Sequence, residues 1–228
     1  MPDTDFPPSV RAEALRILGY TDEPEPEIAA EIEDCYADMR RCAVPRALYG
    51  IFDISVTADA IEITPTLKLC GASLAKLCKN CRKAVLMAAT LGAGVDRLIS
   101  RAEADSVSRA LFIDACASAE IERTCDELEP EIMAKLDGHG DTWLTMRFSP
   151  GYGGVEPTES AKILEALNAG RRIGLTLTKS GMLIPIKSVT AVIGIADRPQ
   201  KRERGCKYCA AAANCPYRKR GAYCGDRS

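Results

Sequence analysis

Two stretches of sequence are the most informative about the fold. Residues 147–157 read RFSPGYGGVEP, and residues 172–194 read RIGLTLTKSGMLIPIKSVTAVIG. The first predicts a strand that ends in an irregular turn, because Pro150 fixes its own φ and biases Ser149 toward an extended conformation. The glycines of this turn permit positive φ and the close approach of a ligand to the backbone. The second stretch predicts short strands, of which the last is apolar and β-branched.

The turn carries groups that could bind a polar ligand. Arg147 stands at its base and could pair with a carboxylate through two parallel hydrogen bonds, while exposed backbone groups could bind other polar atoms. Tyr152 adds an aromatic ring. Most glycine-rich turns are only turns, so the spacing by itself leaves both interpretations open.

The rest of the chain predicts an α+β fold, because helices and strands mix without regular βαβ alternation. Helices are expected at residues 10–18, 24–42, 72–78, 95–104, 107–128 and 158–169. Strands are expected at residues 47–56, 60–64, 84–90, 143–148, 175–178, 182–184 and 188–195. Gly170 is expected to close the helix at 158–169.

The longest helical periodicity runs through residues 107–128. Its repeating positions are four and three residues apart and share one helix face; they are Val107, Leu111, Asp114, Ser118, Ile121, Cys125 and Leu128. Asp114 and Ser118 interrupt an otherwise apolar stripe. Polar groups in such a place either hydrogen-bond inside the core or face a ligand, and both interpretations stay open. Pro130 is expected to end or kink this helix.

Length and composition are those of a globular protein: 228 residues, 46% hydrophobic and 27% charged, enough for one large or two small domains. No apolar stretch approaches the roughly 20 residues of a membrane span, and the N-terminus has no secretory pattern. Eleven cysteines without such a signal indicate a reducing compartment, so we expect a cytoplasmic protein with no membrane partner. His139 is the only histidine, which argues against histidine-rich metal sites and a Ser-His-Asp triad.

The two opening stretches together resemble the activation domain of cobalamin-dependent methionine synthase, which binds S-adenosylmethionine. The Arg-x-Ser-Pro-Gly-Tyr turn at residues 147–152 and the Leu-Thr-x-Ser segment at residues 177–180 carry the resemblance. It covers residues 147–195 well and residues 85–129 loosely, and it extends to free-standing relatives of that domain. It implies a twisted antiparallel sheet flanked by helices.

The resemblance implies an accessory role in reductive reactivation of methionine synthase or another corrinoid methyltransferase. In that family the cobalamin is occasionally oxidised to inactive cob(II)alamin. The activation domain then caps the cobalamin-binding domain and supplies S-adenosylmethionine, and an electron from a reduced flavodoxin or ferredoxin, trapped by methyl transfer, restores methylcobalamin. The implied partners are a corrinoid protein that presents cobalamin and one of these electron donors.

The resemblance also assigns residues to the ligand. Arg147 would engage the methionine carboxylate of S-adenosylmethionine, and Ser149 and Gly151 would offer backbone contacts. Tyr152 would lie near the sulfonium and the corrin, and an aromatic or oxygen-rich wall suits a sulfonium.

The family's long helix adds a glutamate that contacts the ligand. Ser118 falls at that position in this chain, with Asp114 and Glu120 as the nearby carboxylates. The family's late tyrosine has no counterpart in residues 195–200.

The C-terminal segment is basic and rich in cysteine. Residues 198–228 carry nine Lys or Arg and two acidic residues, a net +7, which leaves −9 on the first 197 residues. Four cysteines there could hold zinc or an iron–sulfur cluster: Cys206, Cys209, Cys215 and Cys224. Unpaired thiols are the alternative. Cys78 and Cys81 form a second Cys-x2-Cys pair that is interpreted as structural or incidental, and the other five cysteines are expected in the core.

We therefore expect three parts: an N-terminal addition of helices and strands (residues 1–80), an activation-domain-like core (residues 81–198) and the four-cysteine tail (residues 199–228). Two other functions stay open. One is an electron-transfer or docking protein with this fold that does not bind S-adenosylmethionine. The other is a nucleic-acid-binding module built on the tail, against which the acidic charge of the body argues.

Overall fold

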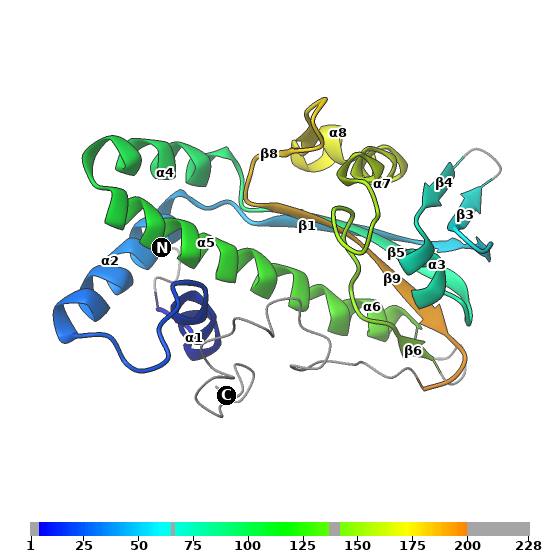
Figure 1. The fold of residues 1–228 in the computed structure, drawn as a ribbon, viewed down its shortest axis with the longest axis horizontal. Coiled ribbons are helices and arrows are strands. Elements are labelled where there is room, and N and C mark those ends of the chain that lie inside the picture. The colour runs from blue at the N-terminus through cyan, green and yellow to red at the C-terminus, as the bar shows by residue number, and fades with distance from the viewer. Residues whose placement is uncertain (1–4, 65–66, 137–141, 200–228) are drawn as a thin grey trace. The chain divides into compact units, whose positions relative to one another are not determined.

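The computed structural model describes residues 5–64, 67–136 and 142–199, whose helices and strands are drawn in Figure 1. The chain divides into two compact units. Among the described residues, unit 1 comprises residues 5–43 and 94–123, and unit 2 comprises residues 44–93 and 124–199. The expected three-part division stays a prediction, and its tail lies, apart from Pro199, outside the described residues.

Unit 1 is helical. It contains α1 (Pro8–Ile17), α2 (Pro26–Cys42), nearly all of α4 (Ala93–Asp105) and most of α5 (Val107–Asp126). Proline opens both α1 and α2, at the position where its missing N–H costs the helix nothing. In α2, Ile32, Cys35, Tyr36 and Met39 are buried at helical spacing, so one face of this helix packs into the unit.

A four-stranded antiparallel sheet is the centre of unit 2. Its strand order is β1 (Arg46–Asp53), β5 (Cys81–Thr90), β9 (Ser188–Ala196) and β6 (Trp143–Leu144). In the two central strands, β5 is buried from Ala84 to Thr90 and β9 from Thr190 to Ala196. Such continuous apolar runs are expected of strands that are covered on both faces.

Smaller elements complete unit 2. A three-stranded sheet is made by β2 (Ser55–Val56), β3 (Ala60–Thr64) and β4 (Leu67–Cys70), and a two-stranded sheet by β7 (Thr176–Leu177) and β8 (Leu183–Ile184). The helices are α3 (Ala72–Leu77), α6 (Leu128–Leu136), the 3-10 turn η1 (Pro157–Glu159), α7 (Ser160–Leu167) and α8 (Ala169–Ile173). Ile163, Leu164 and Leu167 of α7 join Leu86 and Val192 of the central sheet in one hydrophobic core.

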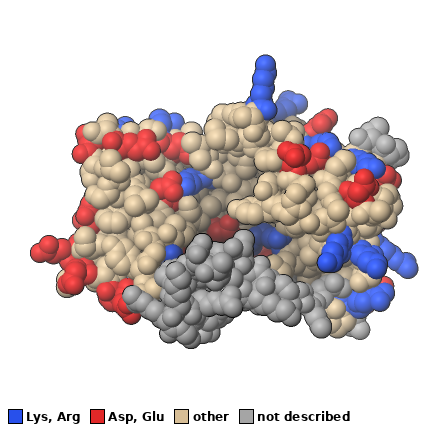
Figure 2. Space-filling view, viewed as in Figure 1, with Lys and Arg blue, Asp and Glu red and all other residues tan. Residues whose placement is uncertain are grey.

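The prediction of an α+β fold with an antiparallel sheet and flanking helices is confirmed. On the face shown in Figure 2, acidic side chains prevail over the helices of unit 1, whereas Lys and Arg stand beside acidic groups on unit 2. No helix in residues 5–64, 67–136 or 142–199 combines the length and apolar character needed to cross a membrane.

Several predicted boundaries were wrong. Only Trp143 and Leu144 of the strand expected at 143–148 form a strand, and Phe148 adds one isolated bridge to Val192. The helix expected at 158–169 breaks at Asn168, which adopts the left-handed conformation, and Gly170 lies inside α8. The long helix ends at Asp126 and not at residue 128, and Pro130 lies in the first turn of the next helix, α6, where proline is tolerated.

Two expectations about burial also need correction. The predicted stripe of α5 is only half buried, since Val107 and Leu111 are 79% and 57% exposed. Cys70, expected in the core, is exposed. Side chains alternate along a strand, so the buried Leu69 of β4 directs its neighbour Cys70 away from the core.

Candidate functional site

The candidate site is the turn at residues 147–155, which Phe148 fastens to the central sheet. The Phe148 N–H donates to the Val192 carbonyl at 2.9 Å, and the Val192 N–H donates to the Phe148 carbonyl at 2.8 Å. This bridge sets the point at which the chain leaves the sheet and the turn begins. Arg147 directly precedes the bridged residue in the chain, and Ser149 directly follows it.

Glycine conformations and internal hydrogen bonds shape the turn. Gly151 has a φ of 97°, in the left-handed region that favours glycine, and its N–H donates to the Val155 carbonyl at 2.8 Å. The Val155 N–H donates in turn to the Tyr152 carbonyl at 3.0 Å. The predicted irregular turn is therefore a closed loop whose backbone is defined by two hydrogen bonds.

Two contacts hold this loop against the rest of unit 2. Val155 is buried in the hydrophobic core, where its side chain faces Gly71. A Cβ on Gly71 would come within 2.2 Å of Val155 Cγ2, so this close packing requires glycine. The Ser73 hydroxyl of α3 donates to the Gly153 carbonyl at 2.7 Å. The loop is thus fixed from one side while its outer residues stay accessible.

The side chains of Tyr152 and Ser149 are accessible in the turn. The side chain of Tyr152 belongs to a residue that is 73% exposed, and Ser149 is partly exposed. Within the described part of the chain, neither the Tyr152 hydroxyl nor Ser149 takes part in a hydrogen bond. An exposed aromatic ring and an open serine therefore lie three residues apart on a rigid support.

Arg147 is held by two carboxylates. Its Nη1 lies 2.6 Å from Asp126 Oδ1, at the end of α5, and 3.7 Å from Glu129 Oε1, in the first turn of α6. The side chains of Arg147 and Glu129 are 17% and 18% exposed, whereas that of Asp126 is 64% exposed. The guanidinium is therefore a positioned, half-buried cation with one carboxylate partner facing solvent.

The two acidic candidates of α5 belong to unit 1. Asp114 is half-buried, and its carbonyl accepts a hydrogen bond from the Ser118 hydroxyl at 2.9 Å. Ser118 thus satisfies its hydroxyl within the helix, which is the common outcome for a serine in this position. The structure places these residues and the turn in different units.

Glu120 lies in a buried ion-pair cluster within unit 1. Its side chain is 0% exposed, and its Oε1 lies 2.7 Å from both Arg40 Nη1 and Arg123 Nη2. The Tyr36 hydroxyl donates to Oε2 at 3.3 Å. Burial, and next the negative charge of Glu120, raise the pKa of Tyr36. Both carboxylate oxygens are engaged by the protein, and contact between Glu120 and a ligand stays a prediction.

The expected metal ligands Cys206, Cys209, Cys215 and Cys224 lie outside the described residues. In the residues that the structure describes, no cluster of three or more His, Cys, Asp and Glu side chains could hold a metal ion.

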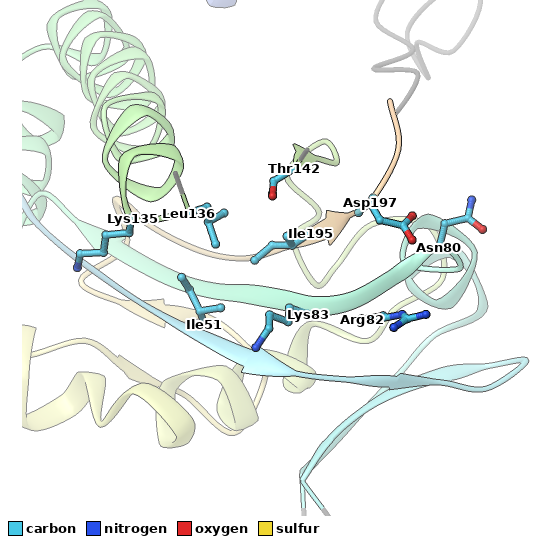
Figure 3. A pocket seen from close by; sticks show the side chains of 10 residues that line it. Ile51, Asn80, Arg82, Lys83, Lys135, Leu136, Thr142, Ile195 and Asp197 are labelled. Carbon is cyan, nitrogen blue, oxygen red and sulfur yellow. The ribbon is translucent and has the colours of Figure 1, made fainter. Parts of the chain in front are cut away.

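A cavity of about 360 Å³ in unit 2 was not anticipated from the sequence. Figure 3 shows Lys135 and Leu136 reaching it from α6, and Arg82 and Lys83 from β5. Its other lining residues are Ile51, Asn80, Thr142, Ile195, Ala196 and Asp197. Lys83 Nζ pairs with Asp53 at 2.8 Å. None of the predicted site residues lines this cavity, and no spacing in the sequence connects residues on five separate segments.

Sequence reasoning also missed Asp126 and Glu129, the partners of Arg147. The available signal was a pair of acidic residues on either side of a helix break near Pro130. Spacing could not reveal the contact, because these residues lie 21 and 18 positions before Arg147 and meet it only in the folded unit.

No family model matches the chain, and no curated protein matches it. Among solved structures, the chain is similar to the MetH reactivation domain bound to AdoHcy, with a TM-score of 0.65 and 16% identity. The match covers 96% of this chain and 83% of that one. A likeness at this identity is evidence of fold. The chain therefore has the fold of the MetH reactivation domain.

Proposed function

We propose that this chain binds S-adenosylmethionine and serves as an accessory protein, or activation subunit, for a cobalamin-dependent methionine synthase or another corrinoid methyltransferase. The observation that carries the proposal is the Arg147–Tyr152 turn, exposed and rigidly supported on this fold. The similar domain was solved with AdoHcy. AdoHcy is S-adenosylmethionine without its transferable methyl group, so a site for one suits the other.

The groups of the turn fit the amino-acid end of S-adenosylmethionine. This end carries a carboxylate, an ammonium group and, close by, the positive sulfonium. Arg147 supplies a fixed cation for the carboxylate, and Ser149 supplies hydrogen-bonding groups without partners in the described residues. The Gly151 N–H is used inside the turn, so its carbonyl is the group left for the ammonium. The exposed ring of Tyr152 suits the sulfonium through cation–π attraction.

Binding of the ligand carboxylate would require an exchange at Arg147. Asp126 faces solvent and Glu129 is largely buried, so the ligand would displace Asp126 while Glu129 keeps the guanidinium in place. An exposed ion pair contributes only about 0–1 kcal/mol, so this exchange is energetically inexpensive.

The partner's cobalamin would supply the acceptor for the methyl group, after a donor such as reduced flavodoxin or ferredoxin has reduced its cobalt. This chain would bind and orient S-adenosylmethionine so that its methyl group faces that acceptor. We further propose that Cys206, Cys209, Cys215 and Cys224 hold zinc or an iron–sulfur cluster. Metal analysis and visible absorbance of anaerobically purified protein would distinguish these two groups.

Calorimetric titration with S-adenosylmethionine tests the proposal. We expect saturable binding by the intact protein and at least a tenfold loss of affinity in Arg147→Ala. Arg171→Ala is a matched control, because Arg171 is exposed on α8 and forms no ion pair within the described residues. Equal affinities for the intact protein and Arg147→Ala would exclude the proposed site. An intact protein that does not bind millimolar ligand would exclude the proposed site and leave the two alternatives, a docking or electron-transfer protein and a nucleic-acid-binding module.

A further inference from the structure

Cys78 and Cys81 bring two thiols together where α3 meets β5. Cys78 caps the C-terminal end of α3, and Cys81 is the first residue of β5. The Cys81 N–H donates to the Cys78 carbonyl at 2.8 Å, which closes a four-residue turn. The ends of such a turn have Cα atoms less than about 7 Å apart, and this overlaps the Cα separation of disulfides.

Gly194 of β9 shows that the two sulfur atoms converge on one point. A Cβ added to Gly194 would lie 2.6 Å from Cys81 Sγ and 3.3 Å from Cys78 Sγ. Both sulfurs therefore occupy the space that a side chain at this position would fill. The central strand leaves room for the pair, and any residue larger than glycine would push the sulfurs away.

The two thiols differ in accessibility and in acidity. Cys78 is 0% exposed, whereas Cys81 is 7% exposed. A hydrogen bond between the thiols lowers the pKa of Cys81 and, together with burial, raises the pKa of Cys78. Cys81 is therefore the thiol that more readily becomes a thiolate and that an attacking molecule meets first.

The buried cysteines of unit 1 provide a contrast. Burial raises the pKa of Cys35 to about 11 and that of Cys116 to about 12. Both thiols donate instead to backbone carbonyls, at 3.9 Å to Arg109 and Ile32 respectively. They stay protonated at neutral pH and behave as small core residues, so the features of the Cys78–Cys81 pair do not follow from burial alone.

We propose that Cys78 and Cys81 form a redox-active dithiol that closes to an intramolecular disulfide on reaction with a low-molecular-weight disulfide such as oxidised glutathione. The Cys81 thiolate attacks one sulfur of the small disulfide, whose S–S bond breaks and releases one small thiolate. Cys78 then attacks Cys81 Sγ and gives up its proton to the departing small thiolate. The Cys78–Cys81 bond forms as the second small thiolate leaves. Two electrons pass from the pair to the small disulfide, which becomes two thiols.

Peptide mapping of the full chain tests this step independently of ligand binding. The folded Cys70→Ser variant, which removes a neighbouring exposed thiol, is equilibrated in defined mixtures of reduced and oxidised glutathione. The reaction is stopped with acid, free thiols are labelled with N-ethylmaleimide after unfolding, and the chain is cleaved after glutamate. Residues 63–103 then form one peptide that contains Cys78 and Cys81.

We expect two labels on this peptide in reducing mixtures and none in oxidising mixtures, with a mass lower by two hydrogens than that of the dithiol. Cys78→Ser should stop at a mixed disulfide of Cys81 with glutathione, and Cys81→Ser should keep its Cys78 thiol free. Two labels at the most oxidising ratio would overturn the proposal. The Cys70→Ser variant alone gives this label count, so the result holds even if the Cys78→Ser and Cys81→Ser variants do not fold.

Discussion

At the scale of single residues, Arg147 is the cation on which the proposed ligand site depends. The sequence predicts a cation at the base of the turn, because the motif at residues 147–152 begins with arginine. Its partners could not be predicted, because Asp126 and Glu129 approach from the ends of two helices that spacing does not connect to the turn. The structure therefore adds a competitor for the ligand carboxylate.

This competition predicts that Asp126→Asn binds S-adenosylmethionine more tightly than the intact protein. The amide keeps the shape of the side chain but lacks the negative charge with which Asp126 competes for Arg147. Because an exposed ion pair contributes about 0.2–1 kcal/mol, the gain should be about 1.4-fold to fivefold. Calorimetric affinities of the two proteins check this, with Asp53→Asn, an exposed residue in the same unit, as a control. Weaker binding by Asp126→Asn would show that Asp126 supports the site.

Gly194 yields a second prediction at this scale. Gly194→Ala should lower the free energy of unfolding by about 1–3 kcal/mol, because its methyl group would overlap the sulfur of Cys81. The same substitution in a Cys81→Ala background should cost less, since the overlapping atom is gone. Urea denaturation of the two single variants and the double variant measures the coupling. Strictly additive losses would show that the sulfur does not fill this space.

At the scale of elements, periodicity predicted which residues share a face but not whether anything covers it. The predicted stripe of α5 is regular from Val107 to Cys125, yet its first two positions, Val107 and Leu111, are exposed, whereas Ile121 and Cys125 are buried. The runs that became β5 and β9 were predicted well, because continuous apolar, β-branched sequence suits central strands. β4 was missed, since its four residues carry too short a pattern.

Asn168 shows why the helix expected at 158–169 divides. It has a φ of 51°, a conformation that asparagine tolerates better than other residues with a Cβ atom. We expect Asn168→Ala to lose about 1 kcal/mol of unfolding free energy, and Asn168→Gly to lose none. Denaturant unfolding of both variants checks this. Equal stability of the alanine and glycine variants would contradict the assigned conformation.

The contact of α2 with α5 depends on the Glu120 cluster. Glu120→Ala should lower the free energy of unfolding by about 3 kcal/mol, because it leaves Arg40 and Arg123 together without their buried counter-charge. Glu103→Ala, at an exposed position of α4, should change stability by less than about 0.5 kcal/mol. A small loss in a folded Glu120→Ala protein, together with weakened binding of S-adenosylmethionine, would instead support the predicted ligand contact.

At the scale of the whole molecule, the fold class could be predicted and is confirmed, whereas the expected three-part division of the chain stays a prediction. The extent of the resemblance suggested a boundary near residue 80, and the basic, cysteine-rich tail suggested one near residue 198. Each compact unit of the structure is built from separate segments of the chain. α5 runs from one unit into the other, and a sequence pattern carries no sign of such a passage. Contacts between segments that are distant in the sequence decide which segments form one compact unit, and local sequence patterns do not reveal these contacts.

Hydrogen exchange with and without saturating S-adenosylmethionine tests whether the turn at residues 147–155 is the ligand site. We expect slower exchange in peptides that span this turn, with little change in peptides from α1 or the three-stranded sheet. In Arg147→Ala, the protection should disappear at the same ligand concentration. Saturable binding without protection of this turn, or with protection confined to other segments, would show that the ligand binds elsewhere.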